Sequence, residues 1–191
     1  MNTGRLEAFS DGVIAVALTV MVLGIDVPDD TTLAALAPLL PQFLTYVLSF
    51  VYIGIYWSNH HHLLHAAERV SGRALWANLH LLFWITLIPL STAWVGVNYT
   101  AAVPTAFYGV ILLLAALAYY ILARVLVGLH GADSALTRAL GRDSKNIASA
   151  VLYALAIPLA FVHTAIADVL YVIVAALWLI PDRRIERNLP V

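Results

Sequence analysis

Long stretches without a charged residue constrain this 191-residue chain more than any other feature of its sequence. Hydrophobic residues make up 62% of the chain and charged residues 11%, against roughly 25% charged residues in an average soluble domain. Apolar runs of this length are typical of helices that cross a lipid bilayer. The sequence therefore predicts an integral membrane protein with several spans and no sizeable soluble domain.

The uncharged runs predict an all-α, polytopic membrane protein, with residues 1–191 forming one domain of six transmembrane helices. One run is too long for a single span, and Pro38 and Pro41 divide it into an outer approach segment and the start of the second helix. No glycine or proline marks the boundary between the last two helices, which is placed partly from charge. The predicted helices cover about 5–27, 40–66, 74–96, 104–127, 145–162 and 164–181.

The basic residues predict the orientation of this bundle. With six spans, all ten lysines and arginines fall in loops on the N-terminal side, and the charged residues of the opposite loops are all acidic. The positive-inside rule then places both termini in the cytoplasm. A single kinked helix over 145–181 would instead move three arginines outside. The basic residues are Arg5, Arg69, Arg73, Arg124, Arg138, Arg142, Lys145, Arg183, Arg184 and Arg187, and the acidic ones are Asp26, Asp29, Asp30 and Asp168.

Composition also excludes several kinds of site. The chain has no cysteine, which rules out disulfides, iron–sulfur clusters and thiolate zinc sites. The net charge of −1 gives no indication of a nucleic-acid partner, and none is expected. Glu7 and Asp11 lie where a cleavable signal peptide would be basic, so the first apolar segment is expected to stay in the mature protein.

The first predicted helix carries an acidic residue at the membrane. Only 14 residues separate Asp11 from Asp26, about 21 Å of helix, whereas the hydrocarbon core of a bilayer is ~30 Å thick. Asp11 is therefore expected within the membrane or at its edge. Ionisable groups at that depth are costly and mark candidate functional sites.

A helical projection divides this first helix into two faces. At 100° per residue, one set of residues falls within about 40° of a single line, and Ser10 and Asp11 point away from that line. The mostly apolar stripe either packs in the bundle core or lines a pore. Its members are Arg5, Phe9, Gly12, Val16, Thr19 and Leu23.

Partners for the polar face are expected on the next two helices. Trp57, Asn59 and His60 lie near the end of the second helix, and Asn78 and His80 lie near the start of the third, at the expected depth of Asp11. Such side chains supply the hydrogen bonds that a buried carboxylate needs. The expected network fastens the helices together.

The pattern Arg5-x-x-x-Phe9-Ser10-Asp11, followed by Thr19 and by Trp57-x-x-His60, resembles the family of transmembrane protein 175, the endosomal and lysosomal potassium channel. A single six-span repeat is similar to the bacterial members of that family. The resemblance implies a homotetramer in a bacterial plasma membrane, with the first helices lining a central pore for potassium. It implies no Thr-Val-Gly-Tyr-Gly filter loop, and the sequence contains none.

The same resemblance implies roles for individual residues. Val16 corresponds to an apolar constriction that is usually Ile or Leu, and Thr19 to a hydroxyl that tunes cation selectivity. Val20 and Leu23 correspond to further apolar layers of the pore. A structural polar network is implied for Arg5, Phe9, Ser10, Asp11, Trp57, His60 and Asn78.

The sequence thus predicts a passive, potassium-permeable channel without enzymatic activity, cofactor or metal site. The acidic cluster Asp26, Asp29 and Asp30 either concentrates cations at the outer mouth or forms an ordinary solvated loop. One alternative is a proton-coupled transporter with an Asp11/His60 relay. A less favoured one is a metal or haem enzyme, because His61 and His65 have a workable ligand spacing.

Overall fold

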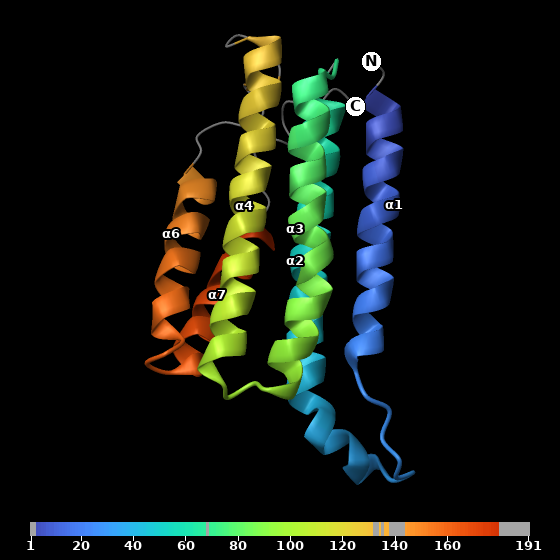
Figure 1. Cartoon of the computed structure of the whole chain (residues 1–191), viewed down its shortest axis with the longest axis vertical. Helices are drawn as coiled ribbons and strands as arrows, with labels where there is room; N and C mark the ends of the chain where they lie inside the picture. The colour runs from blue at the N-terminus through green and yellow to red at the C-terminus, as the bar shows by residue number, and fades with distance from the viewer. Residues whose placement is uncertain (1–2, 68, 132–133, 135, 138–143, 180–191) are drawn as a thin grey trace.

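A computed structural model describes residues 3–67, 69–131, 134, 136–137 and 144–179. Six long helices form one bundle in this part of the chain, which contains no strand (Figure 1). The predicted all-α fold is confirmed. The long helices are α1 (Thr3–Met21), α2 (Leu40–His65), α3 (Gly72–Val97), α4 (Ala102–His130), α6 (Ser144–Leu159) and α7 (Thr164–Leu179).

Four helical segments are long and apolar enough to cross a membrane: Thr3–Gly24, Leu33–His65, Gly72–Val97 and Ala102–His130. Helices α6 and α7 have 16 residues each, about 24 Å, somewhat less than the thickness of a hydrocarbon core. Their crossing of the membrane stays a prediction. The end of the predicted sixth helix lies outside the described residues, together with Arg138, Arg142, Arg183, Arg184 and Arg187.

The first α-helix is shorter than the sequence predicts. It ends at Met21, continues as one 3₁₀ turn over Val22–Gly24, and becomes extended at Ile25. Gly24 lies against α3, where an added Cβ would stand 3.0 Å from the Cβ of Ala93. The glycine permits this close approach, and the chain leaves the helical path there rather than at residue 27.

The second helix is preceded by a separate short segment. A 3₁₀ helix over Leu33–Leu39 contains Pro38, and α2 then begins with Pro41 in its first turn. Proline is tolerated there because the first amide groups of a helix have no intrahelical acceptor. The segment before α2 extends beyond the end of the bundle (Figure 1).

The apolar core lies between α3 and α4 and the helices around them. Small residues allow close helix packing there, as is common in membrane bundles: Ala74 on α3 and Ala115 and Ala118 on α4 are completely buried. Large side chains fill the layers between them. Among them are Leu81, Ile85 and Ile88 on α3 and Leu112, Leu122 and Leu126 on α4.

Hydroxyl groups join the helices through this core. The hydroxyls of Ser49 on α2 and Tyr108 on α4 are 2.9 Å apart, and Thr92 on α3 donates to the Ser49 oxygen at 2.7 Å. On the other side, Tyr52 donates to the carbonyl oxygen of Tyr171 at 2.5 Å. Because hydrocarbon offers no alternative partner, these bonds favour one arrangement of α2, α3, α4 and α7.

Helix α1 stands at the edge of the bundle. It packs against α2 and α3, while α4, α6 and α7 lie on the far side of that pair (Figure 1). One face of α1 is thereby left without a neighbouring helix among the described residues.

Candidate pore helix and its polar anchor

The two faces of α1 differ in burial. The face against α2 and α3 buries Leu6, Ser10, Ile14, Ala17 and Met21, which recur every three or four residues. The opposite face exposes three large apolar side chains of the predicted stripe, Phe9 by 52%, Val16 by 60% and Leu23 by 80%, and beside them Val20 by 48%.

Thr19 lies on this exposed face between Val16 and Val20. Its hydroxyl donates to the carbonyl oxygens of Ala15, at 3.1 Å, and Val16, at 2.9 Å. A threonine inside a helix commonly donates its hydroxyl hydrogen bond to a carbonyl oxygen of the preceding turn. The hydroxyl oxygen keeps lone pairs that can face a cation on the open side of α1.

Three buried side chains form the centre of the polar anchor. Asn78 on α3 donates through Nδ2 to the Ser10 Oγ at 2.9 Å, and its Oδ1 lies 2.6 Å from the Nε2 of His60 on α2. The hydroxyl of Ser10 donates a hydrogen bond to the Leu6 carbonyl oxygen at 2.8 Å. All three side chains are completely buried, so the chain Ser10–Asn78–His60 connects α1, α3 and α2 inside the bundle.

The orientation of Asn78 fixes the roles within this chain. Its amide nitrogen is occupied by Ser10, so its carbonyl oxygen must accept a proton from His60 Nε2. The other ring nitrogen of His60, Nδ1, is buried and has no hydrogen-bond partner among the described residues.

Two further contacts tie α1 to α2 at their more exposed edge. The indole Nε1 of Trp57 donates to Asp11 Oδ1 at 3.0 Å. One helical turn away, Glu7 Oε1 lies 2.7 Å from His61 Nδ1. Because the two helices run antiparallel, Glu7 lies four residues before Asp11 on α1, and its partner His61 lies four residues after Trp57 on α2.

The structure therefore brings together Ser10, Asp11, Trp57, His60 and Asn78 of the predicted network. It leaves Arg5 and Phe9 exposed. Within the described part of the chain, no hydrogen bond or ion pair joins Arg5 to the other network residues, and Phe9 has no polar group to contribute.

The Glu7–His61 contact is not among the pairs that the sequence predicts, although His61 belongs to the polar end of the second predicted helix. The spacing held the signal, because Glu7 precedes Asp11 by four residues and His61 follows Trp57 by four. Among the described residues, no three His, Cys, Asp or Glu side chains are placed to hold a metal ion. The His61 and His65 rings stack on each other, with centroids 6.0 Å apart.

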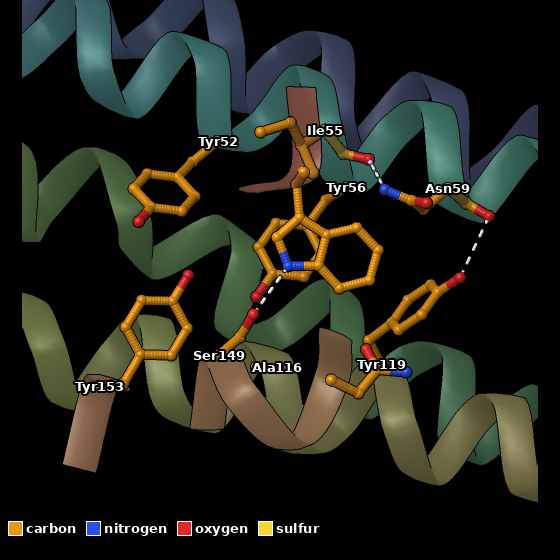
Figure 2. A pocket seen from close by; sticks show the side chains of 10 residues that line it. Tyr52, Ile55, Tyr56, Asn59, Ala116, Tyr119, Ser149 and Tyr153 are labelled. Atoms are coloured by element: carbon orange, nitrogen blue, oxygen red, sulfur yellow. Dashed lines mark hydrogen bonds between the residues drawn. The ribbon is translucent and has the colours of Figure 1, made fainter. Parts of the chain in front are cut away.

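A small cavity lies on the opposite side of α2 from α1, between α2, α4, α6 and α7 (Figure 2). Its volume is about 30 Å³, enough for about two water molecules. Tyr119 donates to the Asn59 carbonyl oxygen at 3.3 Å, and Trp178 donates to Ser149 Oγ at 2.8 Å beside it. No residue of α1 lines the cavity, so it is separate from the exposed stripe.

Comparison with known proteins places this arrangement in a family. Residues 5–89, which hold α1, α2 and the first part of α3, match the family described as endosomal/lysosomal potassium channel TMEM175. A protein named as a potassium channel in Chryseobacterium sp. (strain P1-3) is 48% identical over 189 residues, or 99% of this chain and 98% of that one. The chain belongs to the TMEM175 family.

The fold agrees with this assignment. The crystal structure of a lysosomal potassium-selective channel TMEM175 homolog from Chamaesiphon minutus superposes with a TM-score of 0.80 at 29% identity, covering 95% of this chain and 97% of that one. A rat protein named endosomal/lysosomal proton channel TMEM175 is 39% identical over 96 residues, 44% of this chain and 19% of that longer one.

Membership in the TMEM175 family confirms the prediction that the protein is a channel. The chain is a membrane channel rather than an enzyme, and no cofactor is expected for it. The individual pore and anchor residues stay predictions, as do the number of subunits and the orientation in the membrane.

Proposed function

We propose that this TMEM175 chain forms a passive, potassium-permeable cation channel in a bacterial plasma membrane, with both termini in the cytoplasm. Four copies surround a pore lined by α1. The observation that carries this proposal is the division of α1 into an anchored polar face and an exposed apolar stripe. The names of the bacterial relatives support potassium as the permeant ion.

The exposed stripe provides the proposed filter. Val16 forms the main apolar constriction, where a cation sheds part of its hydration shell, and Val20 and Leu23 add further apolar layers. Thr19 contributes a hydroxyl oxygen close to the constriction. Such a constriction conducts when it is wet and closes when it loses water.

The polar network has a different proposed role. Ser10, Asp11, Trp57, His60 and Asn78 hold α1 in the rotation that turns Val16 towards the pore axis. A relay for a proton-coupled transporter would need Asp11 and His60 in contact, directly or through a chain of donors. Among the described residues, Asp11 bonds to Trp57 and His60 to Asn78, and no hydrogen bond connects the two.

Potassium flux into liposomes that contain the purified protein tests the proposed function. The wild type should conduct potassium down its gradient without a pH gradient. Val16→Ala should raise flux, and Val16→Ala or Thr19→Val should shift the preference between potassium and sodium by about threefold or more. Leu117→Ala, on the exposed surface of α4, is the matched control.

Two results would contradict the proposal. A wild-type protein that is folded and silent would remove channel function, and unchanged flux and ion preference in both variants would remove Val16 and Thr19 from the filter. A flux that requires a pH gradient would favour the transporter alternative.

A further inference from the structure

Phe9 lies on the exposed stripe that the helical projection predicts, and not within the polar network that the family resemblance implies. It exposes about half of its surface on the open side of α1, although Ser10 and Asp11 directly after it are tied to α3 and α2. Phe9 precedes Val16 by seven residues, so the two side chains lie about 20° apart around the helix and ~10.5 Å apart along it. Any pore that Val16 faces is therefore also faced by Phe9.

Gly12 lies between these two residues on the same exposed face. A Cβ added at Gly12 would meet nothing within 4 Å, so packing inside the subunit does not require a glycine there. In a helix interior, glycine costs about 1 kcal/mol relative to alanine. Because Gly12 carries no side chain, it leaves space on the open side of α1 between Phe9 and Val16.

We propose that Phe9 forms a second apolar constriction at the cytoplasmic end of the pore, and that Gly12 keeps a wider chamber between Phe9 and Val16. This inference rests on the proposed tetrameric channel. It assigns to Phe9 and Gly12 a role in permeation that is separate from the filter residues Val16, Thr19, Val20 and Leu23.

The anchor explains how such a constriction is held in place. Ser10 and Asp11 lie 100° and 200° around the helix from Phe9 and are fixed to α3 and α2 by hydrogen bonds of 2.9 and 3.0 Å. Rotation of α1 at this level would break both bonds. The phenyl ring is therefore directed away from the subunit by the residues that immediately follow it.

The arrangement has a consequence for permeation. A cation arriving from the cytoplasm loses water at the Phe9 ring, regains it in the chamber beside Gly12, and loses it again at Val16. Apolar rings of this kind gate by wetting and dewetting, and their width limits the size of the cation that passes. Phe9 thus controls access of large cations to the filter from the cytoplasmic side.

The absence of cysteine in the chain makes a direct test possible. Phe9→Cys, Gly12→Cys and Val16→Cys are compared in inside-out patches exposed to a cationic methanethiosulfonate reagent. Leu117→Cys is the control, because Leu117 is also apolar and exposed but lies on α4. Modification at positions 9 and 12 should reduce the potassium current about tenfold or more, and the control current should not change.

A second measurement addresses width. Phe9→Ala should let cytoplasmic tetrapropylammonium block at about tenfold lower concentration, because the ion then reaches Val16. If Phe9→Cys does not fold, modification of Gly12→Cys and block by tetrapropylammonium still test whether this end of α1 faces the pore.

The possible failures are distinguishable. Block at Val16→Cys, with no loss of current at positions 9 and 12, would overturn the second constriction and leave the channel intact. A wild-type protein without potassium current, or a Val16→Cys protein that is insensitive to the reagent, would contradict the proposed function itself.

Discussion

Helices α1 and α4 are both apolar and long enough to cross a membrane, yet the bundle holds them in different ways. Helix α4 packs against α3, α6 and α7 and buries residues around much of its circumference. Among the described residues, helix α1 packs mainly against α2 and α3 through one buried face, and polar contacts near its first turns join it to both. Close packing surrounds α4, whereas one face of α1 stays exposed in the described structure, where the proposed channel places other subunits and ions.

The largest expected effect is in the packing around α4. In Gly109→Val, the new Cβ would overlap the Tyr171 hydroxyl and crowd Ile157, so we expect a loss of about 3 kcal/mol or more and little folded protein. Gly54→Ala on α2 is the control, because a Cβ there meets nothing within 4 Å. For both variants, the yield of folded protein and its thermal stability are measured by size-exclusion chromatography. A well-folded Gly109→Val protein would show that α4 packs less tightly than its contacts indicate.

Next in size is the loss of the buried anchor. Asn78→Leu removes both hydrogen bonds that join Ser10 and His60, leaving buried polar groups without partners, so a loss of about 2–4 kcal/mol is expected. Thermal melting in detergent measures this loss. Thr86→Leu, on the exposed surface of the same helix, serves as control. Equal melting temperatures in the two variants would exclude Asn78 as the centre of the anchor.

A smaller effect is expected at the Asp11–Trp57 contact, which is partly exposed. Asp11→Ala and Trp57→Phe should each cost about 1–2 kcal/mol and lower the yield of assembled channel, whereas Asp11→Asn keeps an oxygen that accepts from the indole. A double-mutant cycle on melting temperature isolates the pair. Additive effects of Asp11→Ala and Trp57→Phe would mean that the hydrogen bond contributes nothing to stability.

The smallest effect is expected at Glu7 and His61, whose side chains are 25% and 46% exposed. Glu7→Gln should cost at most about 1 kcal/mol, and less at high salt, because solvent screens ion pairs near the surface. Melting at low and high ionic strength provides the measurement. A cost comparable to that of Asn78→Leu would mean that α1 is held mainly at its exposed edge.

Much of the fold followed from the sequence because membrane helices are uncharged and their loops collect the charges. The polar partners of Ser10 and Asp11 could also be predicted, since buried polar groups at one membrane depth must satisfy one another. The helical projection also placed Arg5 and Phe9 on the exposed stripe, whereas the resemblance assigned them to the polar network, because a shared motif does not reveal which of its members face inwards. The hydroxyl contacts of Tyr52 and Tyr108 were also beyond prediction, since they join residues far apart in the chain.

The polar contacts of α1 with other helices lie near one end of the helix, so its residues lie at different distances from this point of attachment. In the described structure, the side-chain hydrogen bonds and ion pairs that lead from α1 to other helices come from Glu7, Ser10 and Asp11. Measured from Asp11, Val16 lies about 7.5 Å along the helix and Leu23 about 18 Å. A tilt of about 5° about Asp11 would move Leu23 by roughly 1.6 Å and Val16 by less than half as much, by simple trigonometry on the rise per residue. Such a tilt would have to loosen the buried packing of Met21 and the close approach of Gly24 to Ala93, so apolar contacts limit the movement of this end of the helix.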